Sequence, residues 1–311
     1  MLSIAVCTRN RPHHLDAWLA HMMMSVIDSA HHPIIIIDQS AIAVQRTWPA
    51  NITYVHMPTR GLARARNIAL QHCTTPYILF TDDDCRPSHD WIIRAHECIT
   101  ADPAVTVWFG QVWPSGTDYT LQQYPTHAGH ISWASRGDGA VCHALRIDDQ
   151  PFRTSQPIAV LEHLGHGNHM LIQCDALRRI GGFASWLGAG AWLASGEDVD
   201  MTLRMLTHGH PCAFAPSLNL IHDAWVLPAE HARLMQRYDT GMIALHIAHA
   251  WRANQVARDY LYFRIKEAIS TLAITTHTSN ATTPVPRWRR IVAIIHGLIG
   301  GIGLIILRRS S

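Results

Sequence analysis

The sequence predicts an α/β protein in which helices flank a mostly parallel central sheet. Within residues 1–100, short apolar runs of strand length alternate with segments whose apolar residues recur at helical spacing. The strand-length runs are almost continuously apolar, which is typical of strands buried on both faces of a sheet that helices cover. A chain of 311 residues can bury one large core or two modest ones.

Three of the six expected strands are apolar runs that stop at a cluster of polar residues. The run Leu2–Cys7 is followed at once by Thr8–Pro12, and Ile34–Ile37 is followed by Asp38–Ser40. Residues 113–157 are rich in Gly, Pro and Ser, so this stretch is expected to be irregular. The expected strands are Leu2–Cys7, Ile34–Ile37, Ile52–Val55, Tyr77–Phe80, Ala104–Val112 and Leu164–Ile172.

The expected helices combine helical spacing of apolar residues with start or stop signals. Ser88 is expected to cap the helix that begins near Asp90, and Gly209 to end the helix before it. The expected helices are His14–Met24, Gly61–Gln71, the helix near Asp90, Asp175–Ile180, Gly196–His208 and Pro228–Leu272.

Composition argues against several classes of function. A formal net charge of +2 without a long basic run argues against a nucleic-acid partner. The seven cysteines contain no CxxC pair, so we expect neither a disulfide framework nor a zinc site. We expect the thiols to be reduced, as in cytosolic proteins. The first residues lack a basic leader and a small-residue cleavage site, so no signal peptide is expected.

Three consecutive aspartates, Asp82, Asp83 and Asp84, follow the strand expected over Tyr77–Phe80. Clustered carboxylates repel one another unless a cation or polar ligand lies among them. Alternate residues of an extended backbone point the same way, so Asp82 and Asp84 are expected to converge on one metal ion, while Asp83 points away. This chemistry suits a bound diphosphate.

Polar residues after two other strands are expected at the same edge of the sheet. Ligands of open α/β sheets bind beyond the carboxyl ends of the strands, where Thr8–Arg11 and Asp38–Ser40 would meet Asp82–Asp84. The alternative for Asp38 is a turn-forming aspartate at a strand end.

Several short blocks of the sequence are weak signals one by one and specific in their combined order and spacing. They are Val6–Arg11, Ile37–Ser40, Gly61–Asn67, Leu79–Asp84, Gly167–Asn168, Gly181–Phe183, Gly196–Asp200 and His222. In this order the blocks resemble the family 2 glycosyltransferases, enzymes with the Rossmann-like GT-A fold. The resemblance covers about residues 1–225.

The resemblance implies a nucleoside diphosphate sugar donor, a divalent cation (Mn2+ or Mg2+) and inversion at the anomeric carbon. By the same resemblance, Asp82 faces the ribose or the water shell of the metal, Asp84 ligates the metal, and His222 completes the site. Uridine is the base expected from its frequency in the family. The expected donor-binding residues are Thr8, Arg9, Asp38, Arg66, Asn67, Asp82 and Asp83.

The pair Glu197-Asp198 is expected to be catalytic, because the resemblance makes Asp198 the general base that deprotonates the acceptor hydroxyl. The alternative is a capping box between Ser195 and Asp198 at a helix start. Glycines at 188, 190 and 196 suggest a mobile loop over the acceptor.

Several charged residues have simpler expected roles. One of Arg64 and Arg66 is expected on a solvated helix face, with Arg66 the choice for phosphate binding. Asp200 and Arg204 are expected to form a helix-surface pair. The histidines at 163, 166 and 169 are treated as acceptor-side or packing residues, because their spacing on a strand does not converge.

The C-terminal segment Ile291–Leu307 carries no charge and lies between arginines at 287, 289 and 290 and at 308 and 309. Such a segment is expected to contact a membrane surface through 287–309. The alternative is a glycine-rich helix packed on the domain or on a partner.

These observations divide the chain into expected parts. A catalytic domain at 1–225 contains a nucleotide-sugar-binding half at 1–112 and an acceptor-side half at 113–225. A helical extension follows at 226–274, and a linker with the apolar tail occupies 275–311.

The expected function is transfer of a sugar, with inversion, to a saccharide or lipid-linked acceptor in polysaccharide or glycolipid assembly. The expected location is the cytoplasmic face of a membrane, peripheral or tail-anchored. A sugar nucleotidyltransferase is one alternative, although the first strand is not followed by a glycine-rich phosphate loop. A non-catalytic, membrane-bound sugar-binding protein is the other.

Overall fold

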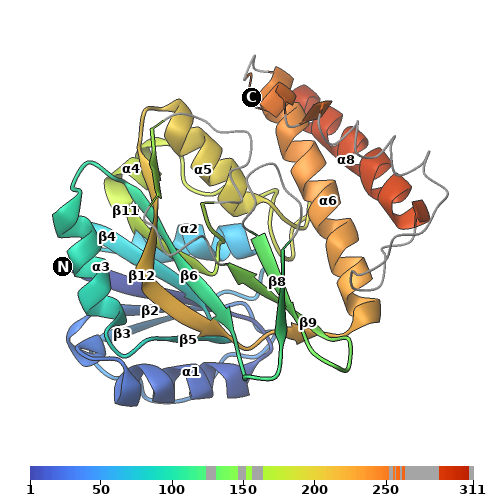
Figure 1. Ribbon diagram of the computed structural model, residues 1–311. Helices are drawn as coiled ribbons and strands as arrows, with labels where there is room; N and C mark the ends of the chain where they lie inside the picture. The colour runs from blue at the N-terminus through green and yellow to red at the C-terminus, as the bar shows by residue number, and fades with distance from the viewer. Residues whose placement is uncertain are drawn as a thin grey trace.

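The computed structural model describes residues 1–123, 131–145, 152–155, 164–251, 255, 257–259, 261–262 and 287–307. One sheet forms the centre, helices cover both of its faces, and two helices, α6 (Pro228–Trp251) and α8 (Arg287–Leu307), lie beside it (Figure 1). The predicted α/β class with a C-terminal helical extension is confirmed.

Four parallel strands form the half of the sheet that carries most of the expected donor-site residues. In spatial order they are β3 (Ile52–His56), β2 (Ile34–Asp38), β1 (Leu2–Thr8) and β4 (Tyr77–Asp82). Thr8 of β1 pairs with Asp38 of β2, and Cys7 pairs with Asp82 of β4. The carboxyl ends of these strands therefore meet at one edge, as predicted.

The sheet is mixed beyond β4. β11 (His169–Gln173) runs antiparallel between β4 and β6 (Val107–Pro114), and β12 (Cys212–His222) runs parallel to β6. The short strand β5 (Cys85–Pro87) pairs with the end of β12, which places His222 opposite Cys85. The strand predicted over Leu164–Ile172 is shorter, because residues 164–168 form a loop that reaches the site.

Strands also occupy much of the region predicted to be irregular, 113–157. β7, β8 and β9 form successive antiparallel pairs, and β9 joins β6 through Leu145 and Val112. Each strand has only three to five residues, which is too short for a clear alternating pattern among many Gly, Pro and Ser residues. The bounds are β7 Thr120–Gln123, β8 Ile131–Ser135, β9 Val141–Leu145 and β10 Phe152–Thr154, with β13 Trp225–Val226 pairing with β9.

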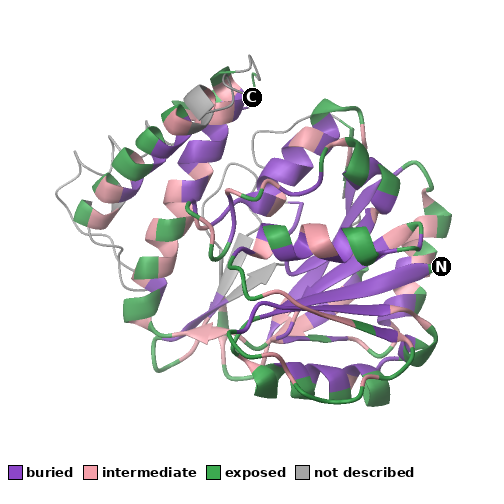
Figure 2. Cartoon of the chain, turned by 180° about the vertical axis from the view of Figure 1, so that it is seen from behind, coloured by how far each residue is buried: buried purple, intermediate pink, exposed green. Residues whose placement is uncertain are grey.

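Two apolar clusters hold the helices on opposite faces of the sheet, whose strands lie buried between them (Figure 2). One contains α1 (Pro12–Ser25) and α3 (Trp91–Ala101); the other contains α2 (Leu62–His72), α4 (Cys174–Arg179) and α5 (Glu197–Thr207). Ser88 does not cap α3 as predicted. Asp90 is the residue before the helix, and the Ser88 hydroxyl instead donates to Asp90 Oδ1 at 2.9 Å.

The C-terminal helices pack closely because α8 presents glycines to α6. A Cβ atom added to Gly297 would lie 2.7 Å from Cβ of Ile243, and one added to Gly301 would lie 2.7 Å from Cβ of Ile247. The packed glycine-rich helix, the alternative prediction for this segment, therefore describes the inner face of α8. The linker predicted over Thr275–Pro286 and the end of the helix predicted over Pro228–Leu272 lie outside the described residues.

Within the described ranges, none of the helices has the length and apolar character needed to cross a membrane.

Candidate functional site

The aspartate cluster lies at the end of β4, where the chain turns into β5. Asp83 points into the protein: the Thr8 hydroxyl donates to its Oδ2 at 2.6 Å, and Arg11 Nη2 donates to its Oδ1. Burial raises the pKa of the Asp83 carboxyl to about 7. Asp83 is therefore a structural residue that joins the ends of β1 and β4, as the alternation along the strand suggested, and both of its oxygens are occupied within the protein. Donor binding by Asp83 stays a prediction, and these two contacts favour the structural role.

Arg11 contacts the aspartate cluster, although it is not among the residues expected to bind the donor. Its Nη1 donates to Asp84 Oδ2 at 2.8 Å, while its Nη2 contacts Asp83. It therefore neutralises part of the carboxylate cluster and orients Asp84. Arg11 belongs to the polar block after the first strand, so its proximity to the aspartates could have been inferred from the parallel register.

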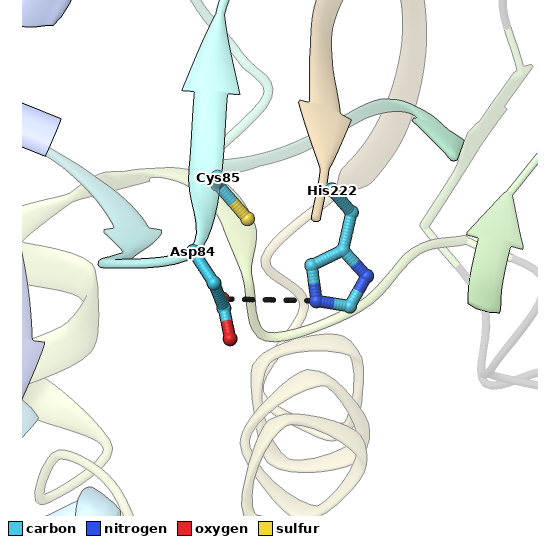
Figure 3. A group of neighbouring side chains, drawn as sticks. All are labelled: Asp84, Cys85 and His222. Atoms are coloured by element: carbon cyan, nitrogen blue, oxygen red, sulfur yellow. Dashed lines mark ion pairs between the residues drawn. The ribbon is translucent and has the colours of Figure 1, made fainter. Parts of the chain in front are cut away.

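Asp84 and His222 form a candidate metal centre at the junction of β5 and β12 (Figure 3). The Nε2 atom of His222 lies 3.7 Å from Asp84 Oδ1, which is buried and accepts no hydrogen bond from the described residues. One carboxylate oxygen and one imidazole nitrogen at this separation fit a bound Mn2+ or Mg2+ ion, since both metals accept such ligands. Cys85 lies beside them, but burial raises the pKa of its thiol well above its ordinary value of 9.0, so it remains protonated.

Asp82 lies between this candidate metal centre and Arg66, the arginine that contacts Glu197. Its Oδ1 lies 3.7 Å from Nη2 of Arg66, and its side chain is partly exposed at 25%. Burial raises the pKa of the Asp82 carboxyl, against the opposing effect of the Arg66 guanidinium. Asp82 thus connects the aspartate cluster to Arg66, which in turn contacts Glu197.

Arg66 is a buried hub that links three parts of the chain. Its Nη1 donates to Glu197 Oε1 at 2.8 Å, and its Nη2 donates to the carbonyl of Gly167 at 2.7 Å. Its side chain is 2% exposed, so these contacts occupy most of the guanidinium. Arg64 is exposed, which confirms that one arginine of this helix lies on the solvated face.

Asp198 lies at the start of α5 with its carboxylate held by backbone. Oδ2 accepts the amide N–H of Gly167 at 2.7 Å, and Oδ1 accepts that of Val199 at 2.9 Å. The capping box predicted between Ser195 and Asp198 is absent: Gly196 precedes the helix with φ of 86°, and the Ser195 hydroxyl contacts carbonyls of α6 at 3.1 Å.

Glu197, next to Asp198, has its carboxyl pKa raised to about 7 by burial and by the charge of Asp198. Gly188 allows the preceding loop to approach it, because an added Cβ there would lie 2.8 Å from Glu197 Oε2. The glycine-rich loop therefore packs against Glu197 at Gly188.

Asp38 forms the turn that was the alternative prediction for it. Its Oδ1 accepts the amide N–H of Ser40 at 2.8 Å, and its Oδ2 accepts the hydroxyl of Tyr54 at 2.6 Å. The residue is completely buried, so contact with a nucleotide base requires displacement of Tyr54 or of the turn. Arg9, by contrast, is exposed beside it and accessible to a ligand.

Asn67, predicted to bind the donor, makes both of its side-chain hydrogen bonds to the backbone of Phe183. Its amide nitrogen donates to the carbonyl of Phe183, and its oxygen accepts the N–H of the same residue, both at 2.8 Å. Gly182 has φ of 72° and leaves no room for a Cβ beside the Asn67 oxygen. This double contact holds the turn 181–183 against α2.

Asp200 and Arg204 form a buried pair, which corrects the prediction of a helix-surface pair. Their side chains are 4% and 15% exposed and lie 2.7 Å apart, and His249 of α6 lies 2.8 Å from the other oxygen of Asp200. The predicted pairing of the two residues one helical turn apart is correct. The sequence spacing does not show that α6 packs over this face of α5.

His169 is a packing residue, in agreement with one of the two roles expected for the histidines at 163, 166 and 169. Its ring accepts Nε1–H of Trp91 at 2.8 Å, and burial lowers its pKa to about 3. His163 lies outside the described residues.

The site therefore brings together most of the residues selected from the sequence. Asp84 and His222 face one another, Asp82 contacts Arg66, and Arg66 contacts Glu197 beside Asp198. Thr8 donates a hydrogen bond to Asp83 and pairs with Asp38 in the register of β1 and β2, so Asp38 lies at the same edge of the sheet.

Comparison with solved structures defines the class of this fold. A mannosyltransferase from Pyrobaculum calidifontis, solved with GDP-Man and Mn2+, matches with a TM-score of 0.56 at 16% identity, over 97% of this chain and 86% of that one. GalNAc-T7, solved with UDP, GalNAc and Mn2+, matches with a TM-score of 0.52 at 13% identity, over 73% and 43% of the two chains. These likenesses show the fold, which is that of the GT-A glycosyltransferases.

The sequence match places the chain within a family of that class. The succinoglycan biosynthesis protein ExoM of Rhizobium meliloti is 26% identical over 238 residues, which are 72% of this chain and 65% of ExoM, so the match spans less than two thirds of that relative. The family described as glycosyl transferase family 2 matches residues 3–180. The chain belongs to glycosyl transferase family 2, as its motifs predicted.

Proposed function

We propose that this protein transfers a sugar from a nucleoside diphosphate donor to an acceptor hydroxyl, with inversion at the anomeric carbon. The observation that carries the proposal is the chain of contacts from Asp82 through Arg66 to Glu197, which joins the aspartate cluster to the acidic start of α5. A transferase needs both at one place, because one stabilises the leaving diphosphate and the other deprotonates the acceptor.

Asp84 and His222, with Asp82 beside them, would hold a divalent ion such as Mn2+ or Mg2+. Such an ion offsets the negative charge that develops on the leaving nucleoside diphosphate. Arg11 fixes Asp84 from the opposite side through its 2.8 Å hydrogen bond, so that the other oxygen of Asp84 remains directed toward His222.

Asp198 would be the general base. Its two backbone hydrogen bonds fix the orientation of the carboxylate. Arg66 and Glu197 act as positioning residues: they tie α5 to α2 and to the loop at Gly167, so the base is held at a fixed place relative to Asp82.

The donor class is proposed from the family and the fold neighbours. The archaeal mannosyltransferase was solved with GDP-Man and GalNAc-T7 with UDP, and uridine is our proposed base for this chain. A role in polysaccharide or glycolipid assembly is supported by the name of ExoM, a succinoglycan biosynthesis protein.

The test is hydrolysis of a panel of nucleotide sugars by the purified protein, with and without Mn2+. Metal-dependent release of nucleoside diphosphate supports the proposal. Release of pyrophosphate from a nucleoside triphosphate and a sugar phosphate would instead identify a nucleotidyltransferase. Absence of turnover with every donor, despite saturable binding of one of them, would identify a non-catalytic sugar-binding protein.

A further inference from the structure

The outer face of α8 is an unusually apolar exposed surface. Five aliphatic side chains on it are between 39% and 59% exposed, and Trp288 at the start of the helix is 57% exposed. Spacing of three and four residues places them on one side of the helix. These aliphatic residues, here called the α8 outer face, are Ile291, Ile295, Leu298, Ile299 and Ile302.

The direction of this face is fixed by packing on the opposite side. Gly297 and Gly301 meet Ile243 and Ile247 of α6 with no space for a Cβ, and Ala293 between the helices is completely buried. A small-residue inner face allows close approach to α6, so the large apolar residues of α8 are left pointing outward. Exposed residues recur along α8, the outermost helix of the molecule (Figure 2).

Charge at the ends of the helix indicates what covers the outer face. Arg287, Arg289 and Arg290 occupy the first turn, Arg308 and Arg309 follow the last, and residues 268–311 contain no aspartate or glutamate. Arg289 is held over the ring of Trp288, with its Cζ 4.5 Å from the ring centroid. An apolar face between cationic ends complements acyl chains bounded by anionic headgroups.

We propose that the α8 outer face lies in the interface of an anionic lipid bilayer, with the helix parallel to the membrane surface. The helix remains against α6 in this arrangement, because its glycines need that partner for close packing. The protein is thus a peripheral membrane protein whose contact surface is one helix face.

The α8 helix also contacts the loop that precedes Glu197 and Asp198. An added Cβ on Gly300 would lie 2.8 Å from Leu193, and one on Gly303 would lie 3.5 Å from Trp192, which is 63% exposed. These two residues directly precede the segment that leads to Glu197 and Asp198. The proposed base therefore lies close to the membrane surface, which suits a lipid-linked acceptor; the assignment of this acceptor rests on the proposed function.

The experiment is co-sedimentation of the full chain with vesicles of phosphatidylcholine alone or with added phosphatidylglycerol. The wild-type protein is expected to bind the anionic vesicles at least tenfold more tightly. The double variant Ile295→Ser with Ile299→Ser is expected to lose at least tenfold in binding. The matched control is Met24→Ser with Ile27→Ser, two exposed apolar residues at the other end of the fold (86% and 47% exposed), which should bind as the wild type does.

Equal binding of the wild-type protein to both kinds of vesicle, or no binding to either, would overturn the proposal. So would a dimer in light scattering that the α8 double variant dissociates, because a second copy would then cover this face. The comparison of wild-type binding between vesicle types does not depend on how the variants fold.

Metal-dependent release of nucleoside diphosphate is measured in parallel. Loss of vesicle binding with unchanged release in the α8 variant supports the lipid surface independently of the chemistry. Intact vesicle binding without release from any donor would refute the proposed function and leave the lipid surface standing.

Discussion

Asp198 is the proposed general base, and its amide analogue tests that role. In Asp198→Asn the remaining side-chain oxygen can still accept the Gly167 N–H, while the amide nitrogen can no longer accept the Val199 N–H; the loop at Gly167 and the donor site are expected to persist. Turnover should fall by about 10²–10⁴-fold, while donor affinity measured by calorimetry stays nearly unchanged. Asp175→Asn, at a site that is 74% exposed, is the control. A rate near that of the wild type would refute the assignment of the base.

Asp84 is expected to act through the metal. Asp84→Ala removes the oxygen that faces His222 and should abolish the dependence of donor binding on Mn2+. Calorimetric titration of the donor with and without Mn2+ measures this directly, with Asp175→Ala as the control. Retention of a metal-dependent affinity gain in Asp84→Ala would show that other residues hold the ion.

Arg66 is expected to be more important for folding than its neighbour Arg64. Arg66→Met leaves the carboxylates of Glu197 and Asp82 without their buried partner, and should lower the free energy of unfolding by about 3–5 kcal/mol. Arg64→Met removes an exposed side chain from the same helix and should change it by less than about 0.5 kcal/mol. Urea unfolding measures both. Equal effects of the two substitutions would contradict the role of Arg66 as a hub.

At the scale of elements, the contact between α6 and α8 depends on the absence of side chains. Gly297→Val would place a Cβ 2.7 Å from Ile243 and should lower the free energy of unfolding by about 1–3 kcal/mol through overpacking. Leu298→Val, one residue away on the α8 outer face, should have a much smaller effect because that side is exposed. Thermal unfolding of both variants checks the prediction, and a larger loss in Leu298→Val would contradict the observed packing.

For the molecule as a whole, Asp200 connects α5 to α6 through its contact with His249. Its pKa is lowered from 3.8 to about 2, because Arg204 and the hydrogen bond from His249 stabilise the carboxylate against the effect of burial. A lowered pKa stabilises the fold above the unfolded value of 3.8, and this stabilisation is lost as the pH falls toward 2. The shift corresponds to about 2 kcal/mol at neutral pH.

The Asp200→Asn variant isolates this contribution. The difference in unfolding free energy between the wild-type protein and Asp200→Asn should be largest near neutral pH and should shrink as the pH is lowered below about 4. Denaturant unfolding of both proteins across this range measures the difference. A difference that does not change with pH would show that the pair acts through packing and not through charge.

Local sequence patterns predicted the α/β class, the order of the elements in the N-terminal half and the residues that meet at the edge of the sheet. Apolar runs and turn residues are local signals, and parallel register then aligns strand ends, so Thr8, Asp38 and Asp82 could be placed together. The family motifs gave Asp84, Asp198 and His222 their expected roles.

The contacts that these residues make depend on the assembled fold. Arg66 contacts Glu197 across 131 positions of sequence, so this partner could not be predicted from local patterns. Asp83, Asp38 and Asn67 are hydrogen-bonded to partners within the protein, and the packing of α6 encloses the pair of Asp200 and Arg204. Local periodicity fixes which face of an element is apolar, but only the assembled chain fixes which polar groups become enclosed with one another and must be satisfied there.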